Sequence, residues 1–245
     1  MSNDVMIARA ERAYGGWLLR MRWRLRTAAV ALCLLVGLLP ASAAVSYLDN
    51  GVIKVGIDLA EGGSITYLSV SGSTNSVIND HDLGRQIQQS YYSGPQPYNP
   101  SNNIHPSWAN WPWNPIQSGD IYNHASTILA ASNDGHILYV KSRPMQWALN
   151  NVPGQCTFES WISLTNNVVT VSNRLVNLRT DTAQQFQARN QELPAVYTVG
   201  TLFRLYSYTG STPFTGAPIT NLPAFGPPNW INWRATESWA ALVAG

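Results

Sequence analysis

The sequence GVIKVGID (residues 51–58), the turn EGG (61–63) and the sequence SITYLSV (64–70) decide the fold. In both runs apolar and polar residues alternate and β-branched residues are frequent, which is typical of strands with one buried face. A Gly-Gly turn between two such runs predicts a β-hairpin. The chain therefore begins its folded part with antiparallel strands.

Further strands are expected along the rest of the chain, and tight turns are expected at Asn133-Asp134-Gly135 and Asn166-Asn167. After the first 43 residues, no stretch keeps an apolar period of 3.6 residues for three turns. We therefore expect an all-β protein with one antiparallel β-sandwich domain over residues 44–245. The additional strands are expected at residues 85–92, 126–131, 136–143, 155–164, 168–178, 184–192 and 196–206.

Residues 1–43 are expected to form a signal-peptide helix that is removed. Arg residues from position 20 to 26 precede an unbroken apolar run (28–39), and Ala41-Ser42-Ala43 matches a signal-peptidase site. Residues 21–43 read as a complete signal, so Met21 is a candidate start. Twelve apolar residues would span about 18 Å as a helix, less than the roughly 30 Å of a bilayer core. We expect a secreted or periplasmic protein without a stable membrane span after cleavage, and an uncleaved anchor is the alternative.

The charge of the expected mature part excludes some classes of function. Six of the 15 basic residues and two of the 13 acidic residues lie in residues 1–43, which leaves nine basic and eleven acidic residues. Nucleic acid is therefore not an expected partner, because its recognition needs clustered Lys and Arg. Cys33 lies in the signal, so Cys156 remains alone and is expected to be a small buried hydrophobe rather than half of a disulfide.

Residues 91–119 contain no Asp, Glu, Lys or Arg and are rich in aromatic rings, proline and amides. Flat rings suit the apolar face of a sugar, and amides both donate to and accept from hydroxyls. Long loops in compact domains are often functional. We expect a glycan-binding loop here, although the tryptophans could instead plug the end of the sandwich or contact another partner. The expected binding residues in this segment are Tyr91, Tyr92, Trp108, Trp111, Trp113 and Asn114.

Polar residues nearby add candidate chemistry. Arg85 follows Asp80-His81-Asp82 and could bind sugar hydroxyls, as could Arg189 beside Glu192. The catalytic candidates are His105, His124 and Glu192, which could act as acids or bases. Structural turns and salt bridges are the alternative roles. No metal or other cofactor is expected, because neighbouring residues on a strand point to opposite faces and rarely chelate together.

The stretches NGVIKV (50–55), GGSITYL (62–68), SVIN (76–79) and DLGRQIQ (82–88) resemble the start of galactose mutarotase-like β-supersandwich domains. Such domains occur in aldose epimerases, glycoside hydrolases and polysaccharide lyases. The resemblance implies a supersandwich and, in an epimerase, a His and a late Glu that move the ring-opening proton. His105 and His124 are candidates for that His by location. Residues 236–245 read as a strand cut off midway, so we expect an N-terminal fragment with the late Glu near or beyond Gly245.

Together these patterns predict an exported carbohydrate-binding or carbohydrate-active protein that recognises a glycan through an aromatic, uncharged loop. A non-catalytic protein-interaction domain and an aldose-1-epimerase-like enzyme are the alternatives. If the protein is an enzyme, we expect a glycoside hydrolase, a polysaccharide lyase or an aldose epimerase.

Overall fold

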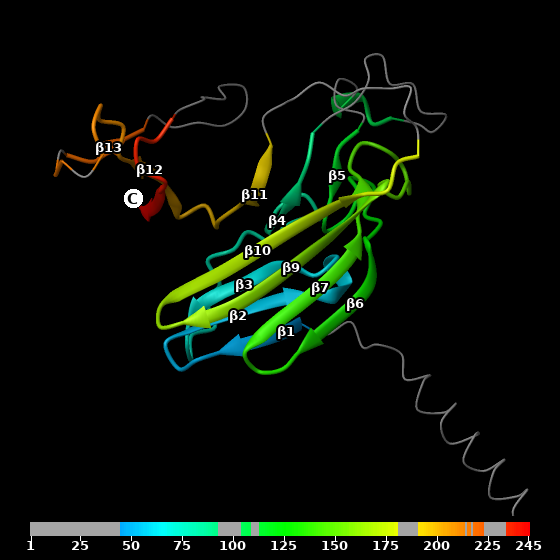
Figure 1. Cartoon of the computed structure of the whole chain (residues 1–245), viewed down its shortest axis with the longest axis horizontal. Coiled ribbons are helices and arrows are strands. Elements are labelled where there is room, and N and C mark those ends of the chain that lie inside the picture. The colour runs from blue at the N-terminus through cyan, green and yellow to red at the C-terminus, as the bar shows by residue number, and fades with distance from the viewer. Residues whose placement is uncertain are drawn as a thin grey trace, which may run out of the picture. The chain divides into compact units, whose positions relative to one another are not determined.

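The structure is a computed structural model that describes residues 45–92, 104–108, 113–180, 191–213, 215–216, 218–222 and 234–245. Within these ranges the chain forms β-strands joined by turns and two short 3-10 helices, and the paired strands are antiparallel (Figure 1). The prediction of an all-β, antiparallel fold is confirmed. The signal segment (1–43), Trp111 and Arg189 lie outside the described residues.

The first sheet is built around the predicted hairpin. Its order is β1-β2-β3-β4-β5-β8, and β11 pairs with β4 on a branch. The turn between β2 and β3 contains the 3-10 helix η1 (Leu59–Glu61), whose N-terminal Asp58 carboxylate accepts a hydrogen bond from the Ala60 N–H. The strands are β1 (Val45–Asp49), β2 (Ile53–Asp58), β3 (Ser64–Val70), β4 (Ile87–Ser90), β5 (Pro115–Ile116), β8 (Met145–Gln146) and β11 (Glu192–Val196).

Gly62 ends this turn in the left-handed region, with φ of 61°. A Cβ at this position would lie 1.8 Å from the Gln117 carbonyl oxygen. The turn therefore needs glycine both for its backbone angle and for the close approach of the segment after β5.

The second sheet has the order β10-β9-β7-β6, and a third, small sheet has the order β13-β12-β14. The long strands of the second sheet fall where alternation predicts them. The bounds are β6 (Thr127–Asn133), β7 (Ile137–Arg143), β9 (Cys156–Thr165), β10 (Val168–Asn177), β12 (Leu202–Ser207), β13 (Thr220–Asn221) and β14 (Ala241–Ala244).

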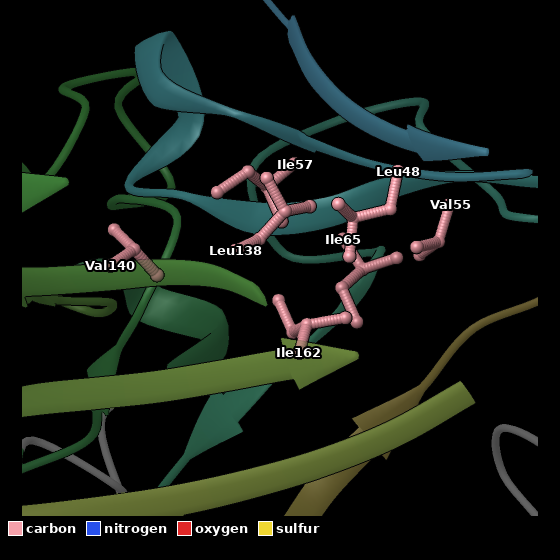
Figure 2. Close-up of a cluster of buried hydrophobic side chains, with 7 residues drawn as sticks. All are labelled: Leu48, Val55, Ile57, Ile65, Leu138, Val140 and Ile162. Carbon is pink, nitrogen blue, oxygen red and sulfur yellow. The ribbon is translucent and has the colours of Figure 1, made fainter. Parts of the chain in front are cut away.

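The first and second sheets face each other across one apolar core. Figure 2 shows side chains from both sheets pointing into the same space. Each of these residues is at most 4 % exposed, and the arrangement is sandwich-like. The core consists of Leu48, Val55, Ile57 and Ile65 from the first sheet and Leu138, Val140 and Ile162 from the second.

A second apolar cluster fixes the loop that precedes β4. Leu83 packs with Ile116 and Trp147, and Trp108 at the end of the 3-10 helix η2 (Pro106–Trp108) lies against them. The Trp147 ring lies so close to Gly84 that a Cβ there would come within 2.5 Å of it. The position of Arg85 is thus set by packing on its N-terminal side.

Two strand predictions need correction. The strand expected over residues 196–206 is divided, because the backbone of residues 197–199 pairs with residues 77–79: the Asn79 N–H donates to the Tyr197 carbonyl and the Val199 N–H to the Val77 carbonyl. Of the strand expected over residues 184–192, residues 184–190 lie outside the described part, and Glu192 instead begins β11. In the described part of the chain, no helix is both long enough and apolar enough to cross a membrane.

Candidate functional site

The pairing of β4 with β11 brings together residues that are about a hundred positions apart in the chain. Glu192 pairs with Ser90, and Val196 pairs with Ile87. The pairing continues beyond Ser90, because the Tyr92 N–H donates to Gln191 Oε1 (2.6 Å) and Gln191 Nε2 donates to the Tyr92 carbonyl (2.9 Å). Antiparallel pairing therefore places Arg85 and Tyr197 near the Ile87–Val196 end of this pair and Tyr92 near Glu192 at its other end.

Electrostatic interactions of Glu192 with Arg85, Tyr92 and Tyr197 link the two ends, and we call these four residues the Arg85 cluster. The Arg85 guanidinium lies 5.3 Å from the centre of the Tyr197 ring, a cation–π arrangement. Its Nη2 lies 3.7 Å from Asp82 Oδ2, and both side chains are more than a third exposed, so this ion pair adds little stability. The guanidinium therefore keeps donors for a ligand.

The carboxyl and phenol groups of the Arg85 cluster have raised pKa values. Burial raises the pKa of Glu192, against the opposing effects of a hydrogen bond from Tyr92 and the charge of Arg85. Burial and then the Glu192 carboxylate raise the pKa of both Tyr92 and Tyr197. A half-buried carboxyl that interacts with two phenol groups and a guanidinium can accept hydrogen bonds from hydroxyls, and a raised pKa suits a general acid or base.

A second polar group is centred on Gln86, the residue that follows Arg85 in the chain. The Gln86 side chain is fully buried, and its Nε2 donates to Glu61 Oε2 (2.8 Å), to Asp80 Oδ1 (3.2 Å) and to the Asp82 carbonyl (2.7 Å). Burial, followed by the charge of Asp80, raises the pKa of Glu61 to about 7. Glu61 is thus a carboxyl that changes its charge near neutral pH.

Sequence reasoning did not identify Glu61 or Tyr197 as site residues. Glu61 reads as part of a hairpin turn, and Tyr197 reads as one residue of a strand. Only the long-range pairing of β4 with β11 and the buried position of Gln86 bring them to the site. Among the described residues, no group of three or more His, Cys, Asp or Glu side chains could hold a metal ion.

His105 contacts Tyr122, and His124 follows Tyr122 by two residues in the chain. His124 Nδ1 is 2.9 Å from Asp120 Oδ2, and the Asp120 side chain is fully buried. Asp120 also accepts hydrogen bonds from the backbone N–H groups of Tyr122, His124 and Asn151. The His105 ring lies 5.9 Å from the Tyr122 ring, edge to face. No described contact joins either histidine to Glu192, so the three catalytic candidates do not form one set.

The aromatic segment packs largely inward where the structure describes it. Trp113 is 9 % exposed and the Asn114 side chain is fully buried. Trp108 packs edge-on against Trp147 with ring centres 5.9 Å apart, and Tyr91 lies 5.2 Å from Phe158. The plug interpretation therefore describes Trp113 and Asn114, which do not belong to an open shelf. The reason is the pairing of this segment with β8, in which the Asn114 N–H donates to Gln146 Oε1 (3.0 Å) and the Trp147 N–H donates to the Asn114 carbonyl (2.8 Å).

Comparison of the chain with protein-family models, with curated proteins and with solved structures found no match.

Proposed function

We propose that the protein is an exported carbohydrate-binding protein that recognises a glycan at the Arg85 cluster. The observation that carries this proposal is the pairing of β4 with β11, which brings a guanidinium, a half-buried carboxyl and two phenol rings close enough for their charges to interact. A sugar presents an apolar C–H face and a belt of hydroxyls. Tyr197 and Tyr92 offer ring surface for the first, while Arg85 and Glu192 offer donors and acceptors for the second.

The sequence next to the Arg85 cluster supports the same ligand. Residues 93–103 follow Tyr92 directly and contain three prolines, three amide side chains within 99–103 and no charged residue. Arg189 precedes Glu192 by three positions. An uncharged, amide-rich continuation is what a neutral glycan would need beyond the cluster itself.

For the finer fold we propose a galactose mutarotase-like supersandwich. The support is the resemblance of residues 50–88 together with two antiparallel sheets that share one core. The same resemblance keeps an enzymatic role in view, as a glycoside hydrolase, polysaccharide lyase or aldose epimerase in which Glu192 acts as acid or base. A protein-interaction domain is the competing class, because the same rings could contact a protein.

A glycan array with the full chain tests the proposal. We expect binding to at least one glycan class, and we expect Arg85→Ala and Glu192→Gln to weaken it by about tenfold each, since each removes a charged hydrogen-bonding partner. Arg204→Ala is the matched control, because Arg204 is also exposed and also lies over a ring, that of Phe203. Circular dichroism establishes that each variant is folded.

Unchanged glycan affinity in folded Arg85→Ala and Glu192→Gln variants contradicts the proposed site. A chain that binds no glycan but captures a protein through these residues supports the interaction domain instead. Polarimetry on free aldoses tests the epimerase alternative, and a rate equal to the uncatalysed rate rejects it.

A further inference from the structure

A pocket of about 280 Å³ opens where the turn after β1 meets the hairpin turn between β6 and β7. It lies at the start of β2, whereas Glu61 and the Arg85 cluster lie beyond its end. Six residues of strand span about 20 Å, so the two places are separate. Its lining includes Leu48, Asp49, Asn50, His136, Ile137 and Ser163, and we call it the turn pocket.

Hydrogen bonds between the two sheets hold the walls of the turn pocket. Asn50 Nδ2 donates to the Asn166 carbonyl (2.7 Å), which ties the turn after β1 to the turn between β9 and β10. Asn133 Nδ2 donates to Ser46 Oγ and to the Tyr47 carbonyl (3.0 Å each), which ties the β6–β7 turn to β1. These turns lie at the same end of the two sheets in Figure 1. The pocket is therefore preformed rather than shaped by a ligand.

The two turns are also fixed internally. Asp134 Oδ1 accepts from the N–H groups of His136 (2.8 Å) and Ile137 (2.7 Å). Asn50 Oδ1 accepts from the N–H groups of Val52 and Ile53 (3.0 Å each). Since these bonds already occupy the turn residues, the groups that remain for a ligand are on Asp49, His136 and Ser163.

The remaining groups match hydroxyls. Asp49 Oδ1 accepts from the Ser71 hydroxyl (2.7 Å) and the Gly51 N–H (3.0 Å), and these bonds lower the pKa of Asp49. Its Oδ2 makes no described hydrogen bond and is an acceptor. The His136 ring and the Ser163 hydroxyl each can donate and accept. Leu48, Ile137 and Leu164 supply an apolar wall.

The charges of the lining residues restrict the chemical class of the ligand further. No Lys or Arg lines the turn pocket, and Asp49 contributes a carboxylate, so an anionic ligand would meet repulsion. The volume is close to the lower limit of the ~300–1,000 Å³ typical of small-molecule sites. A ligand of one ring, with hydroxyls on its edge and C–H groups on its face, satisfies both the wall and the polar groups.

We infer that the turn pocket, which lies apart from the Arg85 cluster, binds a single neutral sugar ring. The carboxylate of Asp49 accepts from ligand hydroxyls, Ser163 and His136 complete the polar edge, and Ile137 and Leu164 contact the C–H face. The inference rests on this cavity alone and does not depend on the function proposed for the Arg85 cluster.

Nuclear magnetic resonance titration of the full ¹⁵N-labelled chain tests the inference. The probes are glucose, galactose, mannose and N-acetylglucosamine, with tetramethylammonium chloride and sodium formate as a cation and an anion of small size. We expect amide shifts confined to residues 48–51, 134–137 and 163–165 with at least one neutral sugar. The Asp49→Asn variant keeps an oxygen that accepts the hydrogen bonds of the turn. We expect Asp49→Asn and Ser163→Ala each to weaken the binding of that sugar about tenfold.

Ser172→Ala on β10 is the matched control, because this serine is exposed and lies outside the pocket, and it should leave the affinity unchanged. Sugar-induced shifts only around Tyr92 and Glu192 overturn the turn pocket while supporting the Arg85 cluster. The inference is also overturned if only tetramethylammonium or only formate shifts the amides of the turn pocket. It is overturned as well if none of the probes shifts them. Sugar shifts in the pocket that persist in Arg85→Ala establish that the two sites are independent.

Discussion

Gln86 bridges two carboxyl groups whose charges repel each other. Its amide donates to both Glu61 and Asp80, and its own backbone takes a φ of 70°, which non-glycine residues rarely adopt. This hydrogen bond lowers the pKa of Glu61, but burial and the charge of Asp80 have the larger effect and raise it to about 7. The region next to the Arg85 cluster therefore gains a negative charge when the pH passes through neutrality.

The raised pKa of Glu61 makes stability depend on pH. Between the ordinary glutamate pKa near 4.5 and the folded value of about 7, the folded chain holds a proton that the unfolded chain has released. We therefore expect the free energy of unfolding to decrease as the pH rises through this interval, and we expect Glu61→Gln to flatten the decrease. Urea unfolding at several pH values across the interval measures both.

Glu159→Gln is the control for this experiment. The hydrogen bond from Arg174 lowers the pKa of Glu159, so its contribution is lost as the pH falls through its folded pKa, below 4.5, rather than as the pH rises. In the Glu159→Gln variant, the free energy of unfolding should still decrease with rising pH above pH 5. An unchanged slope in Glu61→Gln would contradict the assignment to Glu61.

At the scale of elements, the two buried side chains in the middle of β4 are the amides of Gln88 and Gln89 rather than aliphatic groups. Gln88 Oε1 accepts from the Ser118 N–H (2.9 Å) and hydroxyl (2.7 Å), and its Nε2 donates to the carbonyls of Leu83 (3.2 Å) and Arg85 (2.6 Å). Gln89 Nε2 donates to the Glu159 carbonyl (2.9 Å) and to Ser160 Oγ (3.0 Å) on the second sheet. β4 thus holds the loop before it and the facing sheet by hydrogen bonds.

Replacing Gln88 should disturb stability and binding together. Gln88→Leu leaves buried donors and acceptors of Ser118, Leu83 and Arg85 without their partner, and we expect a loss of about 2–3 kcal/mol in the free energy of unfolding. We also expect weaker glycan binding, because the Arg85 carbonyl loses its anchor. Ile87→Val, on the same strand, should cost only about 0.5–1.5 kcal/mol and leave binding unchanged. Urea unfolding and the glycan array measure the two effects, and a stable, fully binding Gln88→Leu variant would refute this role.

The same strands show what the sequence can reveal. β2, β3, β7, β9 and β10 were predictable because their sequences are rich in β-branched residues and alternate, at least in part, between apolar and polar residues. β5 and β8 have two residues each and are too short to carry a period. Arg85, Tyr92 and Glu192 were named from local composition. Their assembly with Tyr197 was not predictable, since it depends on a strand pairing that leaves no local signal.

At the scale of the whole molecule, Cys156 is fully buried at the start of β9 and forms no disulfide in the described part of the chain. Burial raises the pKa of its thiol to about 12. The thiolate, which is the reactive form, is therefore nearly absent at neutral pH in the folded protein. Stability comes from the shared core and not from a covalent bond between strands.

Thiol labelling should consequently report opening of the molecule. In a Cys33→Ser variant we expect no reaction of Cys156 with a thiol reagent under native conditions and complete reaction in urea, and in the unmodified chain we expect the same melting temperature with and without reductant. Mass spectrometry counts the label, and calorimetry measures the melting temperature. Rapid native labelling, with a melting temperature that falls in reductant, would contradict a buried free thiol.

The pairing of β4 with β11 also has a consequence for how the chain is made. Tyr92 and Gln191 are 99 positions apart, and at about 5–20 residues per second of synthesis the first waits roughly 5–20 s for the second. During that interval a nascent chain presents the backbone groups of β4 unpaired on this edge. An unpaired strand edge can pair with another chain, so this interval is when the growing protein is most exposed to aggregation.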